Sequence, residues 1–188
     1  MEKIAIGTNF FIPMPVVLLG TVVKGKANFM TAGWCCRANG NPPMILCGIA
    51  NQHYTPEGIE SAKTFSINLP SSSLLEKTDY CGLVSGKSVD KSHVFDVFYG
   101  TLKTVPMIRE CPVTLECRLV QIVSLPTHKV FIGEIVGAYA DPAIMKNGKP
   151  DFILLDPLFL TMPDNTYWAL GEKRGRAWHD GLSLKKKE

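Results

Sequence analysis

Seven short apolar segments, most of them bounded by glycine, proline or asparagine, constrain the fold of this chain more than any other feature. They cover residues 16–23, 27–34, 44–50, 64–69, 113–123, 129–140 and 151–156. Val, Ile, Leu, Phe and Thr dominate them, and these residues favour pleated strands. Lys24-Gly25-Lys26 is a short turn between the first two segments, so we expect them to pair as a hairpin.

Only two helices are expected between these strands. Thr55-Pro56 offers an N-cap and a proline at the first helical position, leading into residues 57–63. Ser73 and Glu76 have the spacing of a capping box, which opens a helix that runs towards Cys81. Alternating strand and helix units are absent, which argues against a doubly wound sheet. The pattern predicts a mainly β protein: a closed or partly closed antiparallel barrel with a few short helices.

Length and charge narrow the class of protein. With 188 residues and 46% hydrophobic content, the chain can bury one sizeable core, and we expect a single domain over residues 1–188. The net charge of +3 creates no strong field that would favour nucleic acid. We interpret the basic end, residues 183–188, as a solvated and flexible tail, because it lacks the interleaved aromatic residues of a nucleic-acid arm.

The apolar start, residues 10–23, resembles neither a signal peptide nor a membrane span. It contains Pro13 and Pro15, has no small-residue cleavage site and is too short to cross a bilayer. We expect a strand entered through a proline turn, in a cytoplasmic protein without a membrane partner.

The six cysteines predict no metal site and no disulfide framework. None forms a Cys-x-x-Cys pair, and the four histidines are not spaced with them as zinc ligands are. We expect most of them to be reduced and buried as small apolar side chains. The adjacent pair Cys35-Cys36 leaves a second reading open, a reactive thiol beside a ligand.

Two segments thirty residues apart have the composition of a phosphate-binding site. Asn51, His53 and Thr55 lie where an apolar strand gives way to a helix N-terminus, which favours anions. Residues 85–91 combine Ser85 and Gly86 with Lys91, so small donors and unobstructed backbone amides accompany a cation. The Thr55 hydroxyl could equally serve as the helix cap, and His53 and Lys91 taken singly could be solvated surface residues.

The glycines at 82 and 86 do not make a P-loop. That motif needs four residues between its glycines, whereas here there are three. It must also follow a strand and open a helix, but the preceding segment has a helical pattern. Nucleotide hydrolysis is therefore not predicted, while phosphate binding remains open.

Residues 28–36 predict an aromatic slot beside this phosphate site. Asn28, Thr31 and Trp34 share a strand in which small residues would let a flat ring approach the backbone closely. A lone tryptophan is more often part of the core, which is the alternative for Trp34. His128 lies in a turn before a strand, and no nucleophile motif accompanies it. We therefore assign no catalytic side chain.

Taken in order, these segments resemble a known family. The matching residues include Asn28-Phe29-Met30-Thr31-Ala32-Gly33-Trp34, Asn41-Pro42-Pro43-Met44-Ile45, His53-Tyr54-Thr55, Ser85-Gly86 with Asp90-Lys91, and His128-Lys129-Val130-Phe131-Ile132-Gly133-Glu134. The chain is similar across roughly residues 13–140 to the flavin reductase-like proteins, and among them to the flavoredoxin type. No single motif is specific, but their order is. Cys35-Cys36 departs from the expected pattern.

The resemblance implies an FMN-binding split β-barrel of Greek-key type that assembles as a homodimer. It places Asn28 and Trp34 at the isoalloxazine, with the strand around Cys35 and Cys36 nearby. It also implies that Thr55 and Lys91 hold the phosphate with help from His53, Ser85 and Gly86. His128 and Phe159 are further contacts that the resemblance implies.

Three classes of function remain on this reading. The first is an FMN-dependent oxidoreductase that takes hydride or electrons from NAD(P)H or a redox protein partner. The second is an electron carrier that holds FMN without turnover. The third is a small-molecule binding protein that keeps the barrel without redox activity. No Rossmann fingerprint for a nicotinamide cofactor is present.

Overall fold

The computed structural model describes residues 1–185, and three residues of the predicted basic tail, 186–188, lie outside the described residues. The longer strands are β2 (Val17–Val23), β3 (Lys26–Ala32), β4 (Cys35–Asn39), β5 (Met44–Ala50), β6 (Thr64–Leu69), β9 (Val113–Ser124) and β10 (His128–Ala140). The short strands are β1 (Met14–Pro15), β7 (Val97–Phe98), β8 (Met107–Ile108), β11 (Met145–Lys146), β12 (Lys149–Pro150), β13 (Phe159–Thr161) and β14 (Thr166–Trp168). The α-helices are α1 (Thr55–Ala62), α2 (Leu75–Leu83) and α3 (Phe152–Leu155).

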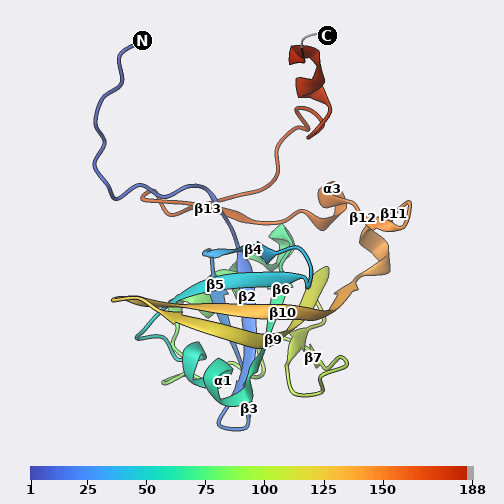
Figure 1. The fold of residues 1–188 in the computed structure, drawn as a ribbon. Coiled ribbons are helices and arrows are strands. Elements are labelled where there is room, and N and C mark those ends of the chain that lie inside the picture. The colour runs from blue at the N-terminus through green and yellow to red at the C-terminus, as the bar shows by residue number, and fades with distance from the viewer. Residues whose placement is uncertain (186–188) are drawn as a thin grey trace.

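Seven antiparallel strands form the main sheet, in the order β3-β2-β6-β9-β10-β5-β4. Figure 1 shows this sheet curling into a barrel, with α1 below it near β3. The predicted hairpin is confirmed, since Val23 pairs with Lys26 across the turn. Lys24 and Gly25 both have positive φ, the conformation that a tight two-residue hairpin turn requires. The predicted mainly β split barrel is therefore the observed fold.

Alternation along the strands places the core inside the barrel. Leu19 on β2, Phe65 on β6 and Phe131 on β10 are fully buried in one cluster. A second cluster around Phe29 and Phe95 lies where α2 covers β3. Burial of such large side chains stabilises the fold by about 1.5–3 kcal/mol for each one. The two clusters hold β3 from both sides, and β3 carries part of the predicted site.

Three local expectations are wrong. Residues 151–156 form helix α3 instead of a strand, because the Asp151 carboxylate accepts hydrogen bonds from the Ile153 and Leu154 amides and caps the helix. The capping box at Ser73 does not form: a 3-10 turn, Ser72–Leu74, precedes α2, and the Ser73 hydroxyl bonds to that of Ser71.

The third wrong expectation concerns the N-cap of helix α1. Thr55 is the first helical residue and not the cap, which is Tyr54 without a side-chain hydrogen bond. The Thr55 hydroxyl is buried and accepts from Asn28 instead. The alternative in which Thr55 caps the helix is therefore not supported. Its hydroxyl instead links α1 to β3 through Asn28.

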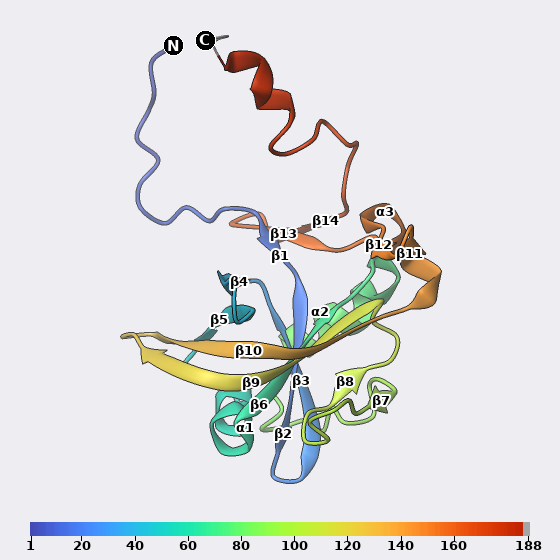
Figure 2. The ribbon, with the colours of Figure 1, turned by 45° about the vertical axis from the view of Figure 1, so that its right-hand side comes forward.

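The two ends of the chain lie away from the barrel. Strand β1 pairs with β13, and β13 pairs with β14, in a separate three-stranded sheet. Figure 2 shows residues before β1 and after β14 extending from this small sheet in the same general direction. A 3-10 helix, Asp180–Leu184, forms near the C-terminal end. In the part of the chain that the structure describes, no helix is long and apolar enough to cross a membrane.

Candidate functional site

Asn28, Thr55 and Gly86 meet at one point, although they come from β3, α1 and the loop after α2. The Asn28 side-chain amide donates to the Thr55 hydroxyl over 3.1 Å. A Cβ at Gly86 would overlap the Asn28 amide oxygen and lie 2.7 Å from the Tyr54 ring. Only glycine therefore lets the loop approach this closely. The sequence predicted all three as site residues, and the structure brings them together.

The loop after α2 is held by its own hydrogen bonds. Ser85 uses its hydroxyl to accept from the Lys87 amide at 3.2 Å, and its carbonyl accepts from the Ser88 and Val89 amides. Lys87 donates through Nζ to the Gln52 carbonyl at 3.2 Å. That bond ties this loop to the turn that carries His53. The two segments predicted as one phosphate site are thus neighbours in space.

Lys91 follows α2 in the chain, and its side chain is buried against the C-terminal end of that helix. Its ammonium donates to the carbonyls of Cys81 and Val84 at 3.2 and 3.1 Å. These are carbonyls at the C-terminal end of a helix, where a cation is favoured. Desolvation lowers the pKa of Lys91, so removal from water disfavours its charged form. A bound anion would offset that desolvation.

His53 reports the electrostatics of this region. Its pKa is lowered from 6.5, first by partial desolvation and then by the positive charges of His128, Lys91 and Lys87. His128, Lys91 and Lys87 therefore lie close enough to His53 to disfavour its charged form, and together the four residues make a group that carries or can acquire positive charge. Such a group is stabilised by an anion placed among its members. This is the strongest electrostatic sign of an anion site in the described residues.

Two hollows lie among these residues. One, of about 300 Å³, is lined by Asn28, Tyr54 and the loop residues 86–91. The other, of about 160 Å³, is lined by residues 30–34, 48–50, His53 and His128. Thr31 borders the second hollow, and its hydroxyl donates to the Thr78 carbonyl of α2. A third hollow of about 300 Å³ continues from Thr31 towards Tyr167, whose hydroxyl donates to Asp79 at 2.9 Å.

Trp34 and His128 form one wall of the smaller hollow. Their rings stack with centroids 4.4 Å apart and planes inclined by 21°. The His128 ring also shares a 2.8 Å hydrogen bond with the Thr127 hydroxyl. Trp34 is 43% exposed, so its alternative assignment to the core is not supported. The ring instead faces the hollow, as the sequence predicted for an aromatic slot.

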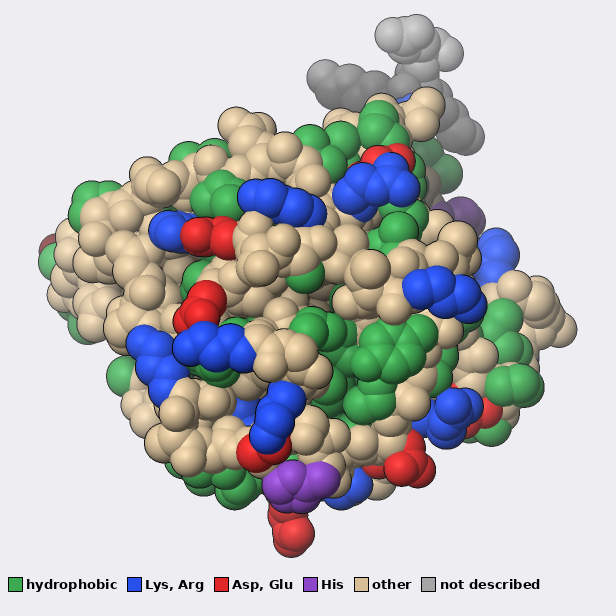
Figure 3. Space-filling model, turned by 90° about the horizontal axis from the view of Figure 1, so that it is seen from below, with side chains coloured by type: hydrophobic (Ala, Val, Ile, Leu, Met, Phe, Trp, Pro, Cys, Tyr) green, Lys and Arg blue, Asp and Glu red, His purple; other side chains and the backbone are tan. Residues whose placement is uncertain are grey.

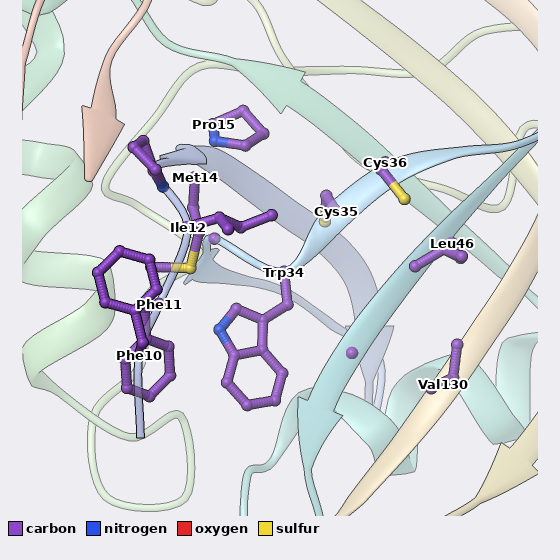
Figure 4. A pocket seen from close by; sticks show the side chains of 13 residues that line it. Phe10, Phe11, Ile12, Met14, Pro15, Trp34, Cys35, Cys36, Leu46 and Val130 are labelled. Atoms are coloured by element: carbon purple, nitrogen blue, oxygen red, sulfur yellow. The ribbon is translucent and has the colours of Figure 1, made fainter. Parts of the chain in front are cut away.

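The far side of Trp34 borders a larger and almost wholly apolar hollow of about 480 Å³. Figure 4 shows Phe10 and Phe11 on one side of Trp34, with Leu46 and Val130 on the other. Phe11 approaches Trp34 with ring centroids 6.2 Å apart. The sequence predicted residues 10–23 as a strand entered through a proline turn, and it did not predict that Phe10 and Phe11 form part of this wall. Their spacing before Pro13 carried no signal for it.

The remaining predicted residues separate into different places. Cys35 is buried and Cys36 is exposed, as alternation on β4 requires. Asn51 is exposed, and its side-chain amide donates to the Pro126 carbonyl at 3.3 Å, which holds the turn before His128. Phe159 pairs with Pro15 in the small sheet and lines none of the four hollows described above. It therefore lies apart from the other predicted site residues within this chain.

Basic side chains extend beyond the hollows. Figure 3, seen from below, shows Lys and Arg side chains spread over this face of the molecule, several of them beside acidic ones. Lys26 pairs with Asp90 at 2.6 Å, and both border the hollow that Lys91 lines. The Lys26 hydrogen bond lowers the pKa of Asp90, which remains ionised at neutral pH. Lys24, which lines the same hollow, pairs with Glu57 at 3.6 Å. Among the described lysines that line this hollow, Lys87 and Lys91 are therefore the two without a carboxylate partner.

Comparison with known proteins shows which family this chain belongs to. Residues 9–157 match the flavin reductase like domain. The chain belongs to the flavin reductase-like family. This family membership, together with the similar structures described next, supports a flavin-binding redox function for this protein.

Solved structures of the flavin reductase-like fold are similar over nearly the whole chain. A flavoredoxin from Methanosarcina acetivorans is 55% identical, with a TM-score of 0.96, over 98% of this chain and 100% of that one. Flavoredoxin of Desulfovibrio vulgaris is 29% identical, with a TM-score of 0.88, over 96% and 100%. An FMN-binding protein from Thermus thermophilus shares the fold at 20% identity, with a TM-score of 0.80, over 94% and 97%.

Proposed function

We propose that this protein binds one FMN without a covalent bond and uses it to transfer electrons or hydride. The observation that carries this proposal is the gathering of His53, His128, Lys87 and Lys91 in one place, where desolvation first and then the charges of the other three lower the pKa of His53. It lies beside a hollow with an aromatic wall at Trp34. A phosphate bound at one end of a flat ring system would match both features.

The residues present fit a phosphate at the Gly86 loop. Gly86 has no side chain to block an approaching oxygen, and a Cβ there would collide with Asn28 and Tyr54. Thr55 and Lys91 would supply a hydroxyl and a charge, with His53 and Ser85 nearby. One such group suits the single phosphate of FMN better than the diphosphate of FAD. The similar Thermus protein is named as FMN-binding, which agrees with this choice.

The ring would lie along residues 28–36. Backbone amides of a strand can donate to the edge of a flat heterocycle, and Asn28 and Thr31 supply polar side chains beside it. Trp34 and His128 would bound the ring at one end. Bound FMN supplies the redox chemistry, and the protein binds, orients and tunes it. We assign no catalytic acid or base, because this chemistry requires none from the protein.

The electron donor has two candidate classes. NAD(P)H would have to stack on an exposed flavin face, because the chain carries no Rossmann fingerprint. A redox protein partner would need only a close approach to the flavin. With either donor, we predict that the protein acts in the cytoplasm.

Spectroscopy of the purified protein tests the proposal. We expect a yellow protein that releases FMN on denaturation, with one flavin per chain by chromatography. Stoichiometric FAD, or no flavin after incubation with FMN and desalting, would contradict it. Anaerobic addition of NADH or NADPH then separates the roles. A reductase should be bleached rapidly, whereas a carrier should be bleached only by a reduced redox protein.

A homodimer forms part of the proposal. The segments before β1 and after β14 expose large apolar side chains to water. Among them are Ile4, Ile6, Phe10 and Ile12 in the first segment, and Trp178 in the second is 98% exposed. Such side chains are costly to expose, and two-fold dimers are the commonest oligomer. Contact with a second subunit would cover them and could bring Phe159 to a flavin site. Light scattering should report twice the chain mass of 20.7 kDa. A monomer that binds FMN tightly would overturn this assembly.

A further inference from the structure

Cys35 and Cys47 lie directly opposite each other on the antiparallel strands β4 and β5. In the same ladder, the Gly48 amide donates to the Trp34 carbonyl at 2.8 Å, so Trp34 and Gly48 form a hydrogen-bonded pair. Pairs alternate along an antiparallel ladder, so Cys35 and Cys47 occupy the non-hydrogen-bonded position, where Cα atoms are about 4.5 Å apart. This separation lies within the range that a disulfide spans, about 4.4–6.8 Å.

The side chains point to the same face and meet. Their Sγ atoms share a hydrogen bond at 2.9 Å, and both thiols are free. We propose that Cys35 and Cys47 are a thiol–disulfide modification site, which closes reversibly to join β4 to β5. This inference does not depend on the bound flavin.

The two thiols differ in access, which gives the reaction an order. Cys47 is fully buried, whereas Cys35 is 7% exposed and belongs to the lining of the 480 Å³ apolar hollow. Burial, followed by the hydrogen bond with Cys35, raises the pKa of Cys47 and keeps it protonated. An uncharged, low-molecular-weight disulfide entering the apolar hollow would therefore reach Cys35 before Cys47. It would also reach the exposed Cys36, which borders the same hollow.

The reaction balances as two exchange steps. The Cys35 thiolate attacks one sulfur of the small disulfide, forming a mixed disulfide and releasing one thiolate, which takes up the proton that Cys35 lost. Cys47 then gives up its proton and attacks Cys35 Sγ, which forms the internal disulfide and releases the second small thiol. The two cysteines are oxidised by two electrons, and one small disulfide is reduced to two thiols.

Closing this bond would act on the strand that follows Trp34. Strand β4 is the last strand of the main sheet and pairs only with β5. Its register is interrupted between Arg37 and Asn39, so hydrogen bonding secures it less than its neighbours. A covalent link one residue after Trp34 would therefore hold the wall between the aromatic and the apolar hollows.

Peptide mapping tests the site directly, because trypsin cuts after Arg37 and separates the two cysteines. We expect folded protein treated with 2-hydroxyethyl disulfide and then blocked with iodoacetamide to yield peptide 27–37 linked to peptide 38–63. The linked pair should weigh two hydrogen atoms less than the sum of the two peptides with Cys35 and Cys47 as free thiols and Cys36 in the same state. Titrated after unfolding, the treated chain should lose the thiols of Cys35 and Cys47, two of its six, in addition to any adduct on the exposed Cys36, and dithiothreitol should restore them.

Peptide 27–37 also contains Cys36, so the test needs matched variants. Cys36→Ser removes an exposed thiol on the other face of β4, and the link should persist in this variant. It should disappear in Cys35→Ser, which retains Cys36. A link that survives Cys35→Ser, or that forms only when denaturant is added before the small disulfide, would overturn the proposal. So would folded wild-type protein that acquires adducts on Cys36 but no link.

Discussion

The rings of Trp34 and His128 stack face to face, with centroids 4.4 Å apart and planes inclined by 21°. Trp34 immediately precedes β4, and His128 begins β10 on the opposite side of β5. The stack therefore bridges two strands that do not pair with each other. It forms part of the wall of the hollow in which we propose that the flavin ring binds.

Removing this stack should have a modest effect on stability. An aromatic pair contributes about 0.5–1.5 kcal/mol beyond its buried area, so we expect His128→Ala to lower the unfolding free energy by about that much. Urea denaturation followed by circular dichroism measures it. His93→Ala, at an exposed histidine, is the control and should have little effect. Equal losses in both variants would show that the stack does not stabilise the fold.

Lys91 should contribute to both binding and folding. Its charge should be worth about 1.5–3 kcal/mol to a bound phosphate, so Lys91→Met should weaken FMN binding by about ten- to a hundredfold. The same change leaves the Cys81 and Val84 carbonyls without their donor and should also lower the unfolding temperature. Titration of the apo-protein and thermal denaturation separate the two effects.

Riboflavin provides the control for Lys91, because it lacks the phosphate. Its affinity should change little between wild type and Lys91→Met if the ammonium acts on the phosphate. An equal loss for FMN and riboflavin would instead indicate a general distortion of the site. An unchanged affinity for FMN would show that Lys91 serves only the end of α2.

The titration of His53 should reveal the anion site. Because its folded pKa lies below 6.5, the unfolded chain takes up a proton first as the pH falls. His53 therefore makes no pH-dependent contribution above pH 6.5, and it destabilises the fold progressively as the pH falls from there through its folded pKa. The variant His53→Gln should lose this part of the acid sensitivity. Denaturation curves on both sides of that pH measure the difference.

Nuclear magnetic resonance of the His53 ring provides a second reading. A bound phosphate adds negative charge among His53, His128, Lys87 and Lys91, so it should raise the pKa of His53. Riboflavin should not raise it to the same extent. A pKa that does not respond to FMN would place the phosphate elsewhere.

Gly86 should be needed for its lack of a side chain. In Gly86→Ala the new Cβ meets the Asn28 amide and the Tyr54 ring, and overpacking of this kind costs about 1–3 kcal/mol. We expect the loop to be displaced and FMN binding to weaken by at least tenfold. Gly40→Ala is the matched control, since nothing lies within 4 Å of a Cβ at that position. Similar affinities in the two variants would remove Gly86 from the site.

The amino-acid sequence by itself determined six of the seven expected strands and the pairing of the first hairpin. Alternating apolar residues bounded by Gly, Pro and Asn can bury one face only as strands, and Lys24-Gly25 permits one tight turn. It also indicated that the segments around Asn28, His53 and Gly86 could bind a phosphate and a flat ring, because they combine short hydrogen-bond donors with glycine. These signals are local, so a single sequence contains them.

Tertiary structure decided where those segments meet and which alternative each side chain adopts. Thr55 could cap its helix or bond elsewhere, and only the packing of α1 against β3 brings Asn28 within reach of its hydroxyl. The wall formed by Phe10 and Phe11, and the pairing of Cys35 with Cys47, likewise depend on strand order and register. Contacts between residues far apart in the chain depend on how the whole core packs, and no local pattern encodes them.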